Sequence, residues 1–172
     1  DTSELSSEIP VDVGEIITND LNRSGVFKAM DRNALVAGPN YSAQVLYSRW
    51  RDAGIEFLIV GRIFEKAPGE YDLQFHLLDV LKQNQLLGYS LPVKKRKLRS
   101  AAHEISDLIY EQITGTRGAF DTRIAYIKSQ SEEARKYILQ VADTDGFNAQ
   151  TVLESDEPLM SPSWSPDGQS LA

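Results

Sequence analysis

The stretch Met160-Ser161-Pro162-Ser163-Trp164-Ser165-Pro166-Asp167-Gly168-Gln169-Ser170-Leu171-Ala172 closes the chain. Its Asp-Gly pair is typical of a tight hairpin turn, because these residues tolerate positive φ angles. Asp145-Gly146 repeats the pair, and Arg123-Ile124-Ala125 lines up with Ser170-Leu171-Ala172 at a spacing of 47 residues. That spacing is close to the length of a propeller blade. We therefore predict that residues 122–172 form the first blade and the start of the second blade of a β-propeller.

Within this region we expect short antiparallel strands and no helix. Ile124–Lys128 and Tyr137–Ala142 have the composition of strands. Trp164 is expected to open a blade, where a large aromatic side chain fills the space between neighbours. The second copy of the repeat stops in mid-strand at Ala172, which predicts a truncated fragment of a longer β-rich chain.

Before Gly118, helical and strand patterns alternate. Asp12 and Glu15 form a capping box that predicts the start of a helix, and Gly25 is placed to end it. Phe27–Met30 is predicted to be a short strand. Ser42 is expected to cap a second helix that Gly54 ends. The inward-facing residues of that second helix are predicted to be Val45, Leu46, Trp50 and Ala53.

From residue 56 to residue 92 the hydrophobic period changes to two, as in a β-meander. Phe57–Phe64 is a nearly continuous apolar run, so we expect it to lie buried inside a sheet. The next strand alternates apolar residues with Asp72, Gln74 and His76, which predicts a half-buried strand. Leu86–Leu91 is the third strand.

The clearest helix of the chain follows this meander. Its apolar stripe covers about four turns, and Gly115 is placed to end it. The stripe consists of Leu98, Ala101, Ala102, Ile105, Leu108, Ile109 and Ile113. Helices packed on a sheet predict a two-layer α/β domain with a mixed sheet over residues 1–116.

Residues 117–121 are predicted to be a short linker between the two domains. Gly115 and Gly118 can adopt backbone angles that other residues avoid. Phe120 is the large apolar side chain available to anchor a contact. We expect Arg117 and Phe120 to fix the relative orientation of the domains, so the candidate site residues are Gly115, Arg117, Gly118 and Phe120.

Composition excludes several classes of function. The chain has 18 basic and 25 acidic residues and a net charge of −7, so it has no general attraction for nucleic acid or anionic lipid. It lacks cysteine, which removes thiol catalysis and Cys-ligated metal sites. The GxSxG, GxGxxG, phosphate-loop and HExxH motifs do not occur. We therefore expect no catalytic residue, no cofactor and no metal.

Two histidines and one acidic loop have both a functional and a structural interpretation. His76 and His103 are too few for most histidine metal sites, and their spacing favours structural or solvated roles. Asp143-Thr144-Asp145-Gly146 resembles the middle of a calcium loop. However, Val141 and Val152 occupy the first and twelfth positions of such a loop, so a hairpin turn is favoured.

The basic run Lys94-Lys95-Arg96-Lys97-Leu98-Arg99 could contact lipid head groups, nucleic acid or an acidic partner. A solvated entry to the following helix is favoured, because no aromatic residues are interleaved and the chain around it is acidic. The acidic run Glu154-Ser155-Asp156-Glu157 is likewise predicted to be an exposed loop.

The closing stretch resembles the repeat of TolB-type β-propellers, although propellers of prolyl-oligopeptidase relatives carry similar Trp-Ser-Pro-Asp-Gly units. Four earlier segments are similar to the amino-terminal part of the TolB family and occur in the same order. They are Asp20–Phe27 with Met30-Asp31-Arg32, Ala53–Gly61, Thr114–Tyr126 and Asp143–Asn148. The chain is identified as a member of the TolB family from about residue 9 to residue 172.

This resemblance implies a non-enzymatic periplasmic adaptor of the Tol–Pal system, with an α/β amino-terminal domain and a six-bladed propeller. Family members bind the lipoprotein Pal through the propeller and TolA through the extreme amino-terminal segment, and reach membranes through these partners only. They maintain outer-membrane integrity, support envelope constriction at cell division and are exploited for bacteriocin import. No cofactor and no catalytic activity are implied.

The family's partner-binding segments are expected to lie largely outside this chain. No counterpart of the family's first segment precedes Asp1, and most of the propeller would follow Ala172, so no partner-binding residue is carried over. The alternative interpretation is a propeller-bearing serine peptidase of the prolyl-oligopeptidase type, whose hydrolase domain would be missing here. A nucleic-acid module that uses Lys94–Arg99 is a weaker third interpretation.

Overall fold

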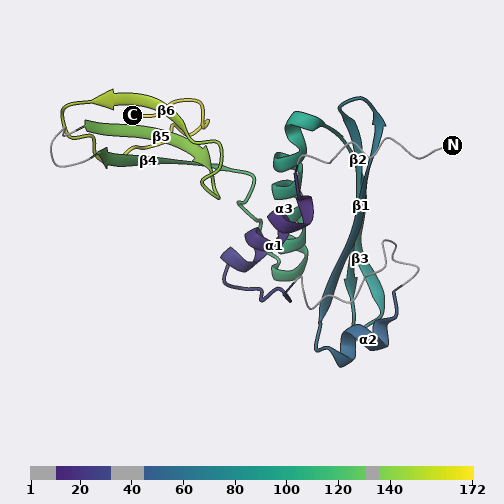
Figure 1. Cartoon of the computed structure of the whole chain (residues 1–172). Coiled ribbons are helices and arrows are strands. Elements are labelled where there is room, and N and C mark those ends of the chain that lie inside the picture. The colour runs from purple at the N-terminus through teal and green to yellow at the C-terminus, as the bar shows by residue number, and fades with distance from the viewer. Residues whose placement is uncertain (1–10, 32–44, 131–135) are drawn as a thin grey trace. The chain divides into compact units, whose positions relative to one another are not determined.

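The computed structural model describes residues 11–31, 45–130 and 136–172 (Figure 1). The chain divides into two units, residues 1–118 and 119–172, which are described separately below. The elements in chain order are α1 (Val13–Arg23), α2 (Tyr47–Asp52), β1 (Phe57–Ala67), β2 (Glu70–Asp79), β3 (Asn84–Lys94), the 3₁₀ turn η3 (Lys95–Lys97), α3 (Leu98–Thr114), β4 (Arg123–Gln130), β5 (Lys136–Asp143) and β6 (Gln150–Ser155). No helix in these ranges has both the length and the hydropathy that a membrane crossing requires.

The first unit contains an antiparallel meander in the order β1-β2-β3, which confirms the predicted succession of three strands. Both pairings among the described strands are antiparallel, whereas a mixed sheet was predicted. The central strand is β2, whereas β1 lies at the edge of the described sheet. The prediction that Phe57–Phe64 is buried inside a sheet is therefore wrong. Burial falls away after Val60, and Phe64 is 37% exposed.

One face of this sheet is covered by α1 and α3 (Figure 1). Because side chains alternate along a strand, the odd-numbered residues of β2 share this face, and Tyr71, Leu73, Phe75 and Leu77 are all buried. From α3, Leu98, Ile105 and Ile109 are at most 1% exposed, which confirms the prediction that they are buried. Gly115 ends α3 as predicted, in the left-handed conformation with φ 74°.

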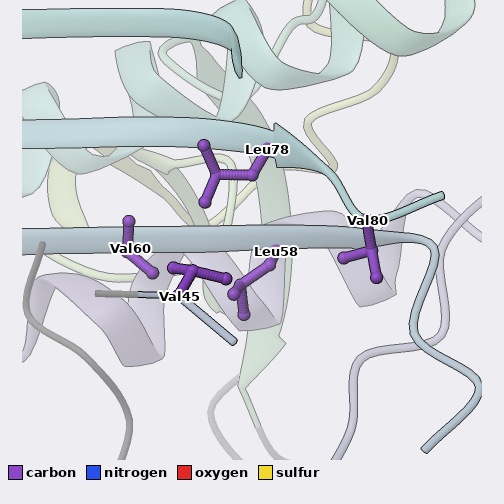
Figure 2. Packing of buried hydrophobic residues seen from close by; sticks show 5 residues of the cluster. All are labelled: Val45, Leu58, Val60, Leu78 and Val80. Carbon is purple, nitrogen blue, oxygen red and sulfur yellow. The ribbon is translucent and has the colours of Figure 1, made fainter. Parts of the chain in front are cut away.

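A second apolar cluster lies at the α2 end of the sheet. It consists of Val45, Leu58, Val60, Leu78 and Val80 (Figure 2), and the side chains of Tyr47, Trp50 and Ile55 pack against it. Leu58, Val60 and Leu78 stand on the face opposite Leu77, because they occupy the alternate positions of their strands. The predicted role of Trp50 as a core residue is confirmed to the extent that its side chain is half-buried here.

The second helix is shorter than its pattern suggested. α2 begins at Tyr47 after Leu46, which makes no side-chain capping bond, and the predicted cap Ser42 lies outside the described residues. Leu46 is 61% exposed and Ala53 is exposed, so their predicted inward orientation is wrong. A helix of six residues makes less than two turns, which is too short to carry a stripe from residue 45 to residue 53.

Helix α1 starts and ends as predicted. The backbone N–H of Glu15 donates to Asp12 Oδ1 at 3.0 Å, and Gly25 adopts a positive φ of 72° just after the helix. Phe27–Met30 is neither helix nor strand, so the predicted strand is wrong. Local side-chain contacts hold this segment instead. Asn22 Oδ1 accepts from the Ala29 N–H at 2.8 Å, and the Phe27 ring lies edge-on to Tyr110 of α3 at 6.0 Å.

The second unit is the antiparallel sheet β4-β5-β6, which confirms the strands predicted there. Its described residues contain no helix. Gly146 and Gly168 both have a positive φ, as the predicted Asp-Gly turns require. The turn at Asp145-Gly146 is part of a longer loop over residues 144–149. The predicted exposed loop at Glu154–Glu157 begins only after Ser155, because the first two of its residues end β6.

Candidate interaction surfaces and the linker

A buried polar pair joins α1 to α3. His103 Nδ1 lies 2.6 Å from Asp20 Oδ2, and the two side chains are 3% and 1% exposed. Asp20 Oδ1 also accepts from the Arg23 guanidinium at 3.0 Å. His103 is therefore a structural histidine, as predicted. The carboxylate that pairs with its Nδ1 belongs to Asp20, which lies 83 residues earlier in the chain.

His76 has the other predicted structural role. It is half-buried on β2, and its Nδ1 lies 2.8 Å from Gln85 Oε1 of the neighbouring strand β3. This cross-strand pair belongs to the polar part of the sheet, next to Gly88, which is the β3 partner of His76. The contact links the His76 side chain of β2 to the neighbouring strand β3.

The same polar face carries a buried carboxylate that the sequence analysis did not single out. Asp72 is 3% exposed, accepts from Ser90 Oγ at 2.7 Å and lies 3.0 Å from Lys66 Nζ. The Ser90 hydroxyl and the Lys66 ammonium hold the pKa of Asp72 below its usual range of about 4. The strand alternation had placed Asp72 on a polar face. Its burial depends on partners that lie in two other strands.

An exposed aromatic ring lies beside this carboxylate network. The Phe64 ring is flanked by the Arg62 guanidinium at 5.4 Å and the Lys66 ammonium at 6.0 Å, both measured to the ring centroid. Arg62 Nε also donates to Gln74 Oε1 at 2.8 Å. These distances are within cation–π range, so the ring and the cations form one surface feature.

The basic run crosses from β3 through η3 into α3. Lys94, Lys95, Arg96 and Lys97 are exposed, whereas Leu98 is buried, which confirms the predicted solvated entry to the helix. The backbone N–H of Lys95 donates to the Gly69 carbonyl at 2.9 Å. This bond places η3 beside the β1–β2 hairpin, at the end of the sheet opposite α2 (Figure 1).

The start of the linker is fixed on α3. Thr114 Oγ1 accepts from the Thr116 N–H at 3.1 Å, just after the left-handed Gly115. Gly118 does not have a positive φ, so the conformational reason predicted for this glycine is wrong. Gly118 lies so close to α3 that a Cβ atom would stand 2.6 Å from the Cα of Asp107. Close approach, not backbone freedom, is what requires glycine here.

The end of the linker is fixed on the second unit. The Phe120 carbonyl accepts from Thr144 Oγ1 at 2.7 Å, and the Thr144 N–H donates to the Thr122 carbonyl at 3.2 Å. Phe120 is 9% exposed, and Arg117 is exposed. The predicted role of Arg117 and Phe120 in orienting the domains stays a prediction.

The closing stretch forms a small hairpin in the second unit. Trp164 makes an isolated β-bridge with Leu171, and the Arg123 guanidinium lies 5.4 Å from the centroid of its ring. The Ser165 hydroxyl and the Gln169 N–H both donate to Asp167 and lower the pKa of that carboxyl. The predicted role of Trp164 between blades stays a prediction, and the hairpin turn at Asp167-Gly168 is confirmed.

Comparison with known proteins matches both parts of the chain. The family model of the TolB amino-terminal domain matches residues 1–86, and that of the TolB beta propeller domain matches residues 110–172. The chain belongs to the TolB family. The predicted fold class is thereby confirmed as an α/β domain followed by part of a β-propeller.

Individual TolB proteins align along almost the whole chain. The Tol-Pal system protein TolB of Hydrogenovibrio crunogenus is 45% identical over 165 residues, and that of Thioalkalivibrio sulfidiphilus is 43% identical over 164 residues. Each alignment covers 95% of this chain and 38% of the relative. The crystal structure of TolB from Acinetobacter baumannii matches with a TM-score of 0.82 and 38% identity, over 92% of this chain and 39% of that one. The chain therefore spans less than half the length of these TolB relatives.

The alternative interpretation as a serine peptidase gains no support from these comparisons. The two matched family models are TolB domains, and the TolB relatives named above are Tol-Pal system proteins. None of these descriptions indicates an enzymatic family.

Proposed function

We propose that this TolB-family chain belongs to a non-enzymatic adaptor of the Tol–Pal system in the periplasm. The adaptor binds the lipoprotein Pal and the protein TolA, and so helps to maintain the outer membrane and to support envelope constriction at division. Bacteriocins that use the Tol system would exploit the same surfaces. The observation that carries this proposal is that both TolB domain models match the chain in order.

The residues agree with a binding role. The chain has no recognised catalytic motif, and its ionic networks at Asp20 and Asp72 are closed by partners within the protein. The second unit exposes apolar side chains such as Val152 and Leu153 at 56% and 48%. Exposed apolar area of this kind suits contact with further structure rather than chemistry on a small molecule.

Pal capture tests the proposal directly. Full-length protein immobilised on beads should retain Pal from a detergent-solubilised envelope extract, detected with an antibody against Pal. Beads carrying an unrelated acidic periplasmic protein of similar net charge are the control, because they report adsorption by charge alone. Retention no greater than on the control beads would contradict the proposed function.

We further propose that the linker couples the two binding events. Gly115 and Gly118 set its path along α3, and Arg117 and Phe120 set the orientation of the domains. Binding of Pal to the propeller would then change the affinity for TolA, and the change must be reciprocal. Its expected size is a coupling free energy of about 1–3 kcal/mol.

The coupling is measured as the ratio of TolA affinities of the full-length protein with and without Pal. Phe120→Ala should bring this ratio closer to one in a protein that remains folded. Phe147→Ala is the matched control, because it removes the same ring at a site that is 55% exposed. An unchanged ratio in Phe120→Ala would show that the linker acts only as a tether.

A further inference from the structure

The fold gathers cations at one end of the first unit. Lys94, Lys95, Arg96 and Lys97 follow one another at the end of β3 and in η3. The hydrogen bond from Lys95 to the Gly69 carbonyl brings them to the β1–β2 hairpin, where Lys66 lies near the end of β1. Arg62 lies in the middle of β1, and its guanidinium reaches the Phe64 ring. We call the six side chains Arg62, Lys66, Lys94, Lys95, Arg96 and Lys97 the basic end.

Cations outnumber carboxylates at the basic end. The acidic residues of the hairpin and its flanks are Glu65, Glu70 and Asp72, so six positive side chains face three negative ones. Asp72 is buried and already paired with Lys66, and the Glu65 carboxylate accepts from the Gly69 N–H at 2.8 Å. The four cations of the run are exposed, so the local charge is positive in a chain of net charge −7.

An exposed aromatic side chain lies beside two cations of the basic end. Phe64 is 37% exposed, and two cations of the basic end, Arg62 and Lys66, lie over its ring. Aromatic rings with cations beside them suit the boundary between water and lipid, because the ring can enter the head-group layer while the charges stay with the phosphates.

We propose that the basic end docks on an anionic phospholipid surface. The run is dominated by lysine, whose ammonium is a mobile point charge without the fixed geometry that reads a single carboxylate. Such a cluster suits a plane of many phosphates, and each basic residue near an anionic bilayer adds about fivefold to the partition coefficient. The β1–β2 hairpin and η3 lie at one end of the sheet, and this end can approach a flat surface end-on (Figure 1).

The negative net charge of the chain restricts the ways in which it can bind an anionic bilayer. A molecule of net charge −7 is repelled by an anionic bilayer when its orientation is random. Binding therefore has to come from the local cluster, in one orientation, and it must weaken as salt screens the attraction. This contact would be direct and would not require Pal or TolA.

Flotation of the purified full-length protein with vesicles tests the proposal. Vesicles of phosphatidylcholine with phosphatidylglycerol should carry the protein upward, and vesicles of phosphatidylcholine alone should not. The triple variant Lys95→Gln, Arg96→Gln, Lys97→Gln should bind about a hundredfold more weakly, at fivefold for each charge. Lys66 is left intact, because its removal would strip the buried Asp72 of its ammonium partner.

A matched variant separates local from global charge. Lys28→Gln, Lys128→Gln, Lys136→Gln removes the same net charge from exposed positions outside the basic end and should bind like the wild type. Equal loss in both triple variants, unchanged binding in the first, or no preference for anionic vesicles would overturn the proposal. Binding to polyglutamate without binding to vesicles would also overturn it, in favour of an acidic protein partner.

Discussion

The two units of the chain bury their apolar residues very differently. Among the described residues, the buried hydrophobic side chains of the second unit are Phe120 and Ala142, whereas the first unit buries residues from α1, α3 and the strands β1 and β2. In the second unit, Ile124, Phe147, Val152, Leu153 and Met160 are 38–83% exposed. The first unit therefore has a core of its own, and the second is a sheet whose faces are largely uncovered.

This difference teaches how each unit obtains stability. The first unit buries apolar side chains on both faces of its sheet, under helices on one face and in a further cluster at the other, and this burial stabilises it. A propeller blade is stabilised by its neighbours, because it contributes faces that adjacent blades cover. Each unit also has its own tryptophan, Trp50 in the first and Trp164 in the second, so fluorescence can report their unfolding separately.

The largest expected contrast comes from two matched truncations. Ile105→Ala should destabilise the first unit by about 2–5 kcal/mol, because this side chain is fully buried in the core beneath α3. Urea unfolding of a Trp164→Phe background, followed by Trp50 fluorescence, measures the change. In the second unit, Ile124→Ala removes the same atoms at a site that is 38% exposed and should cost under about 1 kcal/mol. An equal loss of stability in Ile105→Ala and Ile124→Ala would contradict the proposed difference in how the two units are stabilised.

The buried pair between α1 and α3 predicts the next largest effect. Asp20→Ala should destabilise the first unit by about 3 kcal/mol, because His103 loses its carboxylate partner inside the core. The same urea titration measures it. Glu104→Ala on the exposed side of α3 is the control and should change stability by less than about 0.5 kcal/mol. A cost for Asp20→Ala as small as this control would show that the pair contributes no stability.

A smaller effect is expected where the linker leaves the first unit. Gly118→Ala should destabilise that unit by about 2 kcal/mol, since the new methyl group would clash with the backbone of α3 at Asp107. Trp50 fluorescence should report the loss, and Trp164 should not. Ala119→Gly, one residue later, alters the linker without adding atoms and should leave the first unit unchanged. Equal stability of Gly118→Ala and wild type would mean that the close approach is easily relaxed.

The smallest effect is a dependence on acid pH. Because the folded pKa of Asp72 is lowered, chiefly by the Ser90 hydroxyl, its ionised form stabilises the first unit above the unfolded pKa of about 4. That contribution is lost as the pH falls through the lowered pKa. The stability difference between wild type and Asp72→Asn should therefore shrink below about pH 4. A difference that stays constant from neutral to strongly acid pH would contradict the ionic role of Asp72.

Local signals in the sequence predicted most elements of the fold. The capping residue Asp12, the apolar stripe of α3 and the left-handed Gly115 act over a few residues, and all three are found as predicted. The relationship to TolB was also visible, because the Asp-Gly turn units and the order of several segments are properties of the sequence itself.

Features that depend on distant partners could not be predicted. The apolar run in β1 suggested a central strand, but strand order depends on pairing and not on the composition of one strand. Asp72 was placed correctly on a polar face, but Lys66 and Ser90 come from two other strands and together account for its burial. Asp20 sits at an apolar-face position of α1, and that spacing was the available signal for its burial. His103 lies away from the apolar stripe of α3, so its burial depends on the contact with α1.

The way in which the linker is held has a consequence for proteolysis. Gly118 lies against the backbone of α3, and the carbonyl of Phe120 is bound by Thr144, so Ala119 is all that separates two fixed points. A protease must draw several residues of extended chain into its cleft, and cleavage concentrates where backbone is free to move. The stretch between these two domains should therefore resist limited digestion, in contrast to ordinary domain boundaries. Cutting there would first require unfolding at the end of α3 or at the loop that carries Thr144.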